Sequence, residues 1–82
     1  VWADASTSLS AAQILGQRVR ARRSELGFTL EAAAPRCDLH WSFLGQIERG
    51  QRNLSLNNLL KVAKGLEIDP GELVRGLEPE AS

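Results

Sequence analysis

Apolar residues recur along most of this chain at intervals of three and four positions, with polar residues between them. This spacing places the apolar side chains on one face of an α-helix, whereas a half-buried β-strand would need them at every second position. Short polar or glycine-containing segments interrupt the pattern, and the same spacing resumes after each of them. The sequence therefore predicts an all-α fold of five helices joined by short loops.

The first predicted helix follows Ser10, a residue whose hydroxyl suits an N-cap position. Gln13 stands three positions later, where its side chain can complete a capping box with Ser10. The apolar stripe of this helix continues to Leu26, and Gly27 then supplies a stop signal. We therefore expect a helix that starts after Ser10 and ends near Gly27.

A second, shorter helix is predicted from Leu30 to about Cys37, with Thr29 as its N-cap. Pro35 falls inside this helix, where it removes one backbone hydrogen bond and should bend or shorten the helix. Asp38 follows at the expected turn, and aspartate tolerates a left-handed backbone better than most residues. These features predict a short helix that ends in a tight turn.

The third predicted helix runs from about His40 to Arg49, and it bears most directly on function. Leu44 and Ile47 are expected to face the core, and Gly50 is expected to end the helix. Two short helices joined by a tight turn form the arrangement by which many proteins insert the second helix into the major groove of DNA. The third helix is therefore the predicted DNA-reading element.

Two further helices are predicted toward the C-terminus. Ser55 is the expected N-cap of the fourth helix, and residues 69–72 combine a cap, a proline and an acidic residue at the start of the fifth. The fifth helix carries Leu73, Val74 and Leu77, which give it an apolar face larger than its length needs. Along the fourth helix, apolar residues recur at helical spacing, at Leu56, Leu59, Leu60, Ala63 and Leu66.

The length of 82 residues is enough for one domain and too short for two. We expect a loose arm over residues 1–8, a single domain over residues 9–77 and a polar tail over residues 78–82. No apolar run is long enough to cross a bilayer, and no charged-then-apolar leader precedes the first helix. These features predict a cytoplasmic protein that does not enter a membrane.

Little in the sequence supports catalysis or metal binding. Cys37 is the only cysteine and His40 the only histidine, which excludes an internal disulfide and the usual four-ligand metal cluster. No nucleophile has a matched base, so we expect no enzyme activity. We also expect no cofactor, no metal and no small-molecule ligand, and we interpret Cys37 as a small apolar residue of the second helix.

The charge of the chain is balanced, with ten lysine and arginine residues against ten aspartate and glutamate residues. A nucleic-acid-binding protein often carries a basic surplus instead. The arginines at positions 18, 20, 22 and 23 wrap around the first helix, so we do not expect them to form one DNA-binding surface. Acidic residues gather toward the C-terminus. This distribution is compatible with DNA binding but lowers the expected non-specific affinity.

Over about residues 14–74 the chain resembles the helix-turn-helix regulators related to the Cro and lambda-type phage repressors. The resemblance is carried by LGQRVRARRSELGFTLEAA in the first two helices, followed by DLHWSFLGQIERGQRNLSLNNLLKVAKGLEIDPGEL. Its most specific part is IERGxRN followed by SLxxLLKxAKxL. The segments DLH and RNLSL are similar to those of the small controller proteins of bacterial restriction-modification systems. The implied fold is a five-helix, lambda-repressor-like DNA-binding domain.

This resemblance implies a homodimeric, sequence-specific regulator of transcription from a bacterium or a phage, bound to double-stranded DNA at the nucleoid. Two copies of its third helix are expected to enter successive major grooves, with half-sites roughly 34–36 Å apart. By position, the base-contacting residues of the family fall on Trp41, Ser42 and Gln46. Phosphate contacts fall on the starts of the second, third and fourth helices and on the loop after the third, at Thr29, His40, Arg49, Gln51, Arg52, Asn53 and Asn57.

Two structural roles also follow from the resemblance. Arg23 and Glu48 match positions that form an ion pair between the first and third helices of the family. Dimer contacts are expected on the fifth helix, at Leu73, Val74 and Leu77. Together these residues would fix the reading helix in the domain and join two copies of the domain.

Several residues depart from the family pattern. Leu30 replaces the usual polar glutamine, Asp38 replaces the customary turn glycine, and Pro35 is foreign to the second helix. Trp41 stands where an arginine or a glutamine is usual, and tryptophan offers only one N–H donor beside a large apolar face. Trp41 could therefore contact a thymine methyl group or a sugar, pack against a partner subunit, or lie partly in the core.

Alternatives remain for the other candidates. Gln46 could pair with an adenine edge or be a solvated polar residue, and the loop over residues 49–53 could bind phosphate or be a solvated charged loop. His40 could contact a phosphate or only shape the local turn. The whole chain could also be a protein-interaction module that keeps the fold and has lost DNA binding. The zero net charge, Leu30 and Trp41 favour that alternative.

Overall fold

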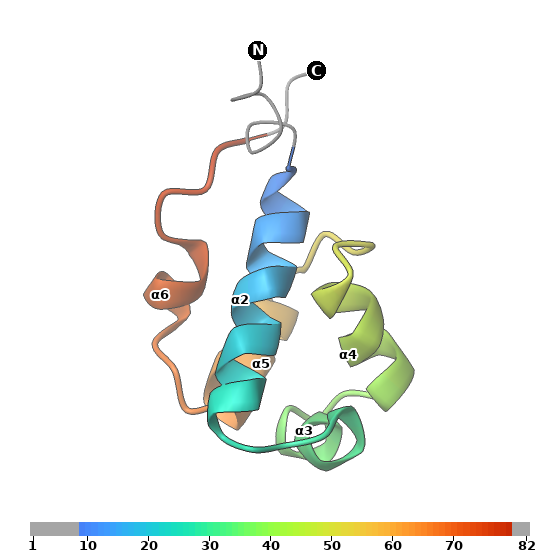
Figure 1. Ribbon diagram of the computed structural model, residues 1–82. Helices are drawn as coiled ribbons and strands as arrows, with labels where there is room; N and C mark the ends of the chain where they lie inside the picture. The colour runs from blue at the N-terminus through green and yellow to red at the C-terminus, as the bar shows by residue number, and fades with distance from the viewer. Residues whose placement is uncertain (1–8, 80–82) are drawn as a thin grey trace.

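The computed structural model describes residues 9–79, which form five α-helices (Figure 1). In chain order these are α2 (Ala11–Glu25), α3 (Leu30–Arg36), α4 (Trp41–Glu48), α5 (Leu56–Gly65) and α6 (Pro70–Val74). The described part of the chain contains no β-strand, and the predicted all-α, five-helix fold is confirmed. The predicted arm over residues 1–8 and the last positions of the predicted tail, 80–82, lie outside the described residues.

Side-chain caps start four of the five helices. Ser10 and Gln13 form the predicted capping box, because the Ser10 hydroxyl accepts the Gln13 N–H at 3.1 Å and the Gln13 carbonyl accepts the Ser10 N–H at 2.8 Å. Thr29 and Ser55 each accept the N–H three positions later at 3.1 Å. Asp69 precedes α6 but makes no such bond, and α6 is only five residues long. The helix starts are therefore fixed mainly by local sequence.

The core lies where the five helices meet. Leu44 and Ile47 of α4 face inward, as the sequence predicts. Gly16 lets α2 and α4 approach closely, because a Cβ at this position would overlap the carbonyl oxygens of Ile47 and Glu48. The close approach holds α4 against the longest helix of the domain. The buried apolar residues are Leu15, Val19, Ala33, Ala34, Cys37, Leu44, Ile47, Val62, Ala63, Leu66 and Leu73.

The turn between α3 and α4 is closed by backbone hydrogen bonds at the end of α3. Asp38 has a positive φ of 54°, the left-handed conformation expected for it. The Asp38 N–H bonds to the Pro35 carbonyl at 3.1 Å, and the Leu39 N–H bonds to the Ala34 carbonyl at 3.0 Å. This is the Schellman pattern of a helix end, and it reverses the chain with no glycine. The helix that contains Pro35 has only seven residues, in keeping with the predicted shortening.

The apolar stripe of α5 is only partly buried. Leu56 is 71% exposed and Leu60 is 45% exposed, so these two positions of the stripe do not belong to the core. The fully buried side of α5 is formed by Val62 and Ala63, followed by Leu66 at the C-cap. Leu56 and Leu60 lie one turn apart along the edge of this stripe, and both are exposed. They leave α5 with an exposed apolar strip.

Arginines of α2 hold the C-terminal part of the chain. Arg18 donates to the carbonyl oxygens of Leu73 and Arg75 at 3.1 and 2.7 Å. Arg22 donates to the carbonyl oxygen of Leu66 at 2.9 Å. These carbonyls lie at the ends of α5 and α6, where the helix itself supplies no partner. Both arginines therefore stabilise the fold, consistent with the expectation that the arginine cluster is not one DNA-binding surface.

Candidate nucleic-acid interface

Helix α4 lies on the outside of the bundle, on the opposite side of α2 from α6 (Figure 1). Its inner face is buried at Leu44 and Ile47. Its outer face carries Trp41 and Ser42, which are exposed, and Gln46 one turn later, which is half-buried. The three residues expected to read bases therefore share the outward side of one short helix.

A largely buried ion pair fixes α4 against α2. Arg23 donates from Nε to Glu48 at 2.6 Å and from Nη2 at 2.9 Å, and its Nη1 donates to the Phe28 carbonyl at 2.8 Å. The Glu48 side chain is only 6% exposed. The hydrogen bond to Glu48 raises the pKa of Arg23 above its ordinary value, although burial opposes the shift. This two-point contact is the pairing that the family resemblance implies, and it sets the orientation of α4.

The imidazole ring of His40 caps the N-terminus of α4. Nδ1 of His40 accepts the Ser42 N–H at 3.2 Å and lies 2.8 Å from the Ser42 hydroxyl. Because Nδ1 accepts a backbone N–H, the neutral ring must carry its hydrogen on Nε2. His40 is thus a helix cap, which favours a role in the local turn over a contact with phosphate. The same contact engages the hydroxyl of Ser42.

Trp41 projects from the first turn of α4. Its side chain is 50% exposed, and its ring is stacked against the His40 ring with centroids 5.7 Å apart. This exposure argues against a place in the core. A half-exposed indole at the start of the reading helix can instead contact DNA or a partner, and His40 holds it in position.

A hydrogen bond between two side chains joins α4 to the loop that follows it. Arg52 donates from Nε to the Gln46 side-chain oxygen at 2.8 Å. Its guanidinium also lies over the Phe43 ring, 5.4 Å from the centroid. Arg52 therefore folds back along α4 toward its outer face. No local pattern predicts this contact, because residues 46 and 52 do not lie on one helix.

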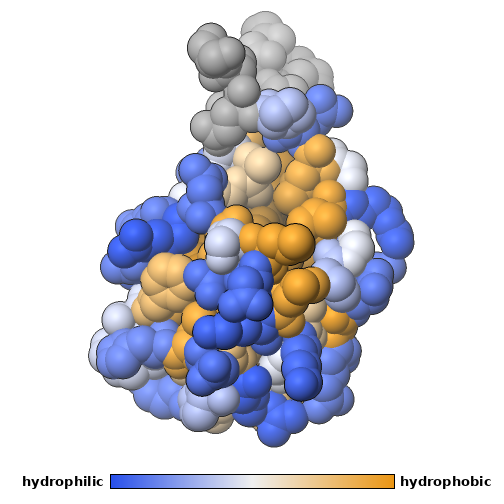
Figure 2. Space-filling view, turned by 180° about the vertical axis from the view of Figure 1, so that it is seen from behind, coloured by the Kyte–Doolittle hydropathy of each residue, from blue (hydrophilic) through white to orange (hydrophobic). Residues whose placement is uncertain are grey.

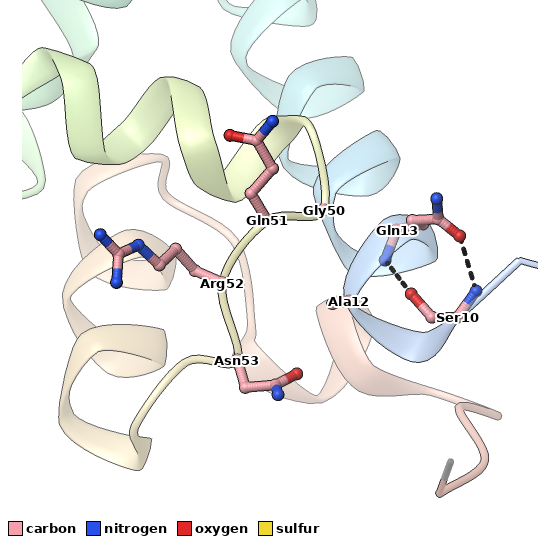
Figure 3. Close-up of a pocket in the computed structure, with 7 residues that line it drawn as sticks. All are labelled: Ser10, Ala12, Gln13, Gly50, Gln51, Arg52 and Asn53. Atoms are coloured by element: carbon pink, nitrogen blue, oxygen red, sulfur yellow. Dashed lines mark hydrogen bonds between the residues drawn. The ribbon is translucent and has the colours of Figure 1, made fainter. Parts of the chain in front are cut away.

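The rest of the loop is exposed and polar. Arg49, Gln51 and Asn53 are all exposed, as phosphate-contacting residues must be. The loop packs beside the start of α2 and leaves an open polar hollow of about 360 Å³. Arg52 extends from the loop away from the Ser10 end of α2 (Figure 3). The hollow is lined by Ser10, Ala12, Gln13, Gly50, Gln51, Arg52 and Asn53.

The two helix starts expected to bind phosphate differ in charge. The first turn of α3, after Thr29, contains the acidic Glu31, whereas the first turn of α5 contains no acidic residue. Asn57 lies exposed in that first turn of α5. A helix N-terminus attracts anions, and a carboxylate in its first turn opposes a second anion. The start of α5 is therefore the better candidate of the two for holding an anion.

The residues expected at the dimer interface separate into buried and exposed ones. Leu73 is completely buried in the core of the subunit, so it has no exposed surface for the predicted contact with a partner. Val74 is 38% exposed, and Leu77 is half-buried against the core.

The sequence pattern did not predict the exposed apolar strip on α5. Leu56, Leu60 and Val74 are exposed, and we call these three residues the α5–α6 apolar surface. Figure 2 shows hydrophobic residues gathered on the face opposite to the view of Figure 1, where α5 lies behind α2. The leucines are visible in the sequence at helical spacing, but spacing alone does not distinguish a buried position from an exposed one.

Cys37 is buried between α3 and α5, and its thiol lies 3.9 Å from the Val62 carbonyl. Burial raises the pKa of this thiol, which keeps it in the neutral form. Within residues 9–79 no group of three or more histidine, cysteine or acidic residues is placed to hold a metal ion. In the same part of the chain, no helix has the length and apolarity needed to span a membrane.

Comparison with known proteins gives one consistent result. The profile of the helix-turn-helix family matches residues 19–73. Control protein C.BamHI from Bacillus amyloliquefaciens is 42% identical over 62 residues, which cover 74% of this chain and 76% of the relative.

Two solved structures are similar in both fold and sequence. The restriction-modification controller protein C.AhdI from Aeromonas hydrophila has 45% identity and a TM-score of 0.73, over 76% of this chain and 94% of that one. The P22 c2 repressor protein, solved in complex with a synthetic operator, has 31% identity and a TM-score of 0.71, over 78% of this chain and 97% of the repressor.

Proposed function

The chain belongs to the helix-turn-helix family of sequence-specific DNA-binding transcriptional regulators, and we propose that it acts as a homodimeric controller protein on an operator with two half-sites. In this proposal the α4 helices of two copies enter successive major grooves, roughly 34–36 Å apart. The regulated genes would belong to a restriction-modification system, as the names of the relatives suggest for those proteins. The site of action would be the nucleoid, in the cytoplasm.

The observation that carries the proposal is the outer face of α4. Trp41, Ser42 and Gln46 point outward from a helix that the buried Arg23–Glu48 pair fixes against α2. A rigid helix with exposed polar and aromatic side chains can read base edges, whereas a mobile helix would lose affinity through ordering. His40 serves this face indirectly, because it caps α4 and supports the Trp41 ring.

Phosphate contacts would set the register of α4 on the duplex. We assign them to Arg49, Gln51 and Asn53 of the exposed loop and to Asn57 at the acid-free start of α5. Thr29 contributes less in this scheme, because Glu31 lies in the same helix turn. A small number of cationic contacts agrees with the zero net charge of the chain.

The α5–α6 apolar surface is the proposed dimer interface. Its exposed leucines and valine gain apolar burial if they meet the same residues of a second copy across a twofold axis. Leu77 can extend the contact at its edge, while Leu73 supports it from within the core. Operators with two similar half-sites follow from this symmetry.

Selection of bound sequences from a random duplex pool tests the proposal as a whole. We expect enrichment of one sequence with two related half-sites, and an affinity that falls as salt concentration rises. If the protein fails to bind any duplex even at low salt, the DNA-binding proposal fails and the protein-interaction module becomes the better interpretation.

A further inference from the structure

The contact between Gln46 and Arg52 determines which hydrogen-bonding groups α4 can offer to a base. A glutamine amide has one oxygen that accepts and one nitrogen that donates, whereas a guanidinium has donors only. The bond of 2.8 Å from Arg52 Nε therefore turns the Gln46 oxygen toward Arg52. The Gln46 NH₂ group is left to face other partners.

This orientation matters because the two purines require different partners in the major groove. Adenine offers an acceptor at N7 and a donor at N6, so a glutamine reads it with both its nitrogen and its oxygen. Guanine offers acceptors only, at N7 and O6. Because the Gln46 oxygen is turned toward Arg52, the groups that Gln46 and Arg52 present to a base are all donors. A cation beside the N6 amino group of adenine would also be unfavourable, whereas beside O6 of guanine it is favourable.

Other contacts keep Arg52 in this position before DNA binds. Its guanidinium is stacked over the Phe43 ring, one turn before Gln46 on α4. Within residues 9–79, the ion pairs do not include Arg52, so no carboxylate draws it away from Gln46. The arrangement is thus built into the free protein by α4 and the loop after it.

We propose that Arg52 is a specificity-determining residue, which holds the oxygen of Gln46 and so makes Gln46 select guanine where a free glutamine would select adenine. The proposal rests on the proposed function, because it concerns the base that α4 reads on DNA. It assigns Arg52 a role distinct from a phosphate contact, since a phosphate contact weakens binding to all sequences equally.

The test is selection from a random duplex pool, run in parallel with the unmodified 82-residue chain and three variants, Gln46→Ala, Arg52→Ala and Arg49→Ala. Arg49 provides the matched control, because it is an exposed arginine next to the same loop and its guanidinium lies beside Gly45. All three side chains lie outside the core, and circular dichroism verifies that each variant keeps its helix content.

We expect the unmodified protein to enrich guanine at one position of each half-site, and Gln46→Ala to lose the preference at that position. Arg52→Ala should change the preference at the same position from guanine to adenine, with a shift of about tenfold in relative affinity. Arg49→Ala should keep guanine and lose affinity for all sequences alike.

Three results would overturn the inference while leaving DNA binding intact. The unmodified protein could enrich adenine at the Gln46-dependent position, Gln46→Ala could leave every preference unchanged, or Arg52→Ala could keep guanine with a uniform loss of affinity. A protein that enriches no sequence at all would instead overturn the proposed function. The two failures are therefore distinguishable in one experiment.

Discussion

The outer face of α4 and the α5–α6 apolar surface are both exposed, yet they are built in different ways. On α4 the outward side chains are polar or aromatic, and most of them are held by neighbours: Ser42 by His40, Trp41 by His40 and Gln46 by Arg52. On α5 and α6 the outward side chains are Leu56, Leu60 and Val74. One face is prepared for hydrogen bonds to a polar partner, and the other for contact with an apolar one.

The difference indicates that the two proposed binding events have different physical drivers. Contacts of α4 and its loop with DNA involve charge and release counterions, so they weaken as salt concentration rises. Association through leucine and valine removes apolar area from water and is little affected by moderate salt. The two events can therefore be changed separately, and the following predictions are designed to do so.

The largest expected effect comes from breaking the ion pair behind α4. Glu48→Ala leaves Arg23 without its carboxylate partner in a largely buried place, which should destabilise the domain by about 3 kcal/mol. Urea unfolding measures this effect. The matched control is Arg75→Ala, which breaks an exposed pair with Glu72 and should cost less than about 1 kcal/mol. Equal losses in the two variants would show that the Arg23–Glu48 pair does not hold α4.

A second prediction concerns dimerisation through the α5–α6 apolar surface. Leu60→Ser should weaken dimerisation by more than about tenfold, because each of two symmetric copies loses roughly 1 kcal/mol of apolar burial. Sedimentation at tens of micromolar protein measures the change. Leu60→Met keeps the apolar area and serves as the control. If Leu60→Ser remains as dimeric as the unmodified protein, or if the unmodified protein is a monomer, the proposed interface is incorrect.

A smaller effect is expected on the DNA side. Arg49→Ala should reduce the slope of log affinity against log salt by about 1, since it removes one phosphate contact. Titrations of a duplex at several salt concentrations give the slope. Dimerisation of the same variant should stay unchanged, because Arg49 lies on the α4 side of the molecule. An unchanged slope would show that Arg49 is a solvated residue.

The smallest effect concerns the start of α4. His40→Ala removes the side-chain acceptor of the Ser42 N–H and should cost about 1 kcal/mol or less in unfolding free energy. His40→Asn replaces the cap and should restore most of this stability. If His40→Ala keeps full stability and loses only DNA affinity, His40 is a phosphate contact instead of a cap.

Much of the secondary structure was predictable because its signals are local. The Ser10–Gln13 capping box, the cap at Thr29 and the left-handed Asp38 each depend on residues within a few positions. The pairing of Arg23 with Glu48 joins two helices that are far apart in the sequence, and only the family resemblance predicted it. The Arg52 contact to Gln46 was not predicted, because it depends on the path of the loop after α4.

Burial was harder to predict than helix formation. Leu56 and Leu73 are both leucines at helical spacing, yet one is 71% exposed and the other is completely buried. The hydrophobic pattern reports that a helix has an apolar face, but not how much of that face a neighbouring helix covers. Helix α5 therefore carries an apolar strip beyond the part that the core uses.

The five helices and their starts could be predicted from the sequence, because capping, turn conformation and helical period act over a few residues. The family followed from the motif IERGxRN and the segment after it. Which of these side chains are free to bind depends on how the helices pack. In the folded protein Leu73 is buried, Leu56 is exposed, and the Gln46 oxygen accepts a hydrogen bond from Arg52. The physical reason is that exposure and hydrogen-bond partners depend on groups brought together from distant parts of the chain, which no local pattern specifies.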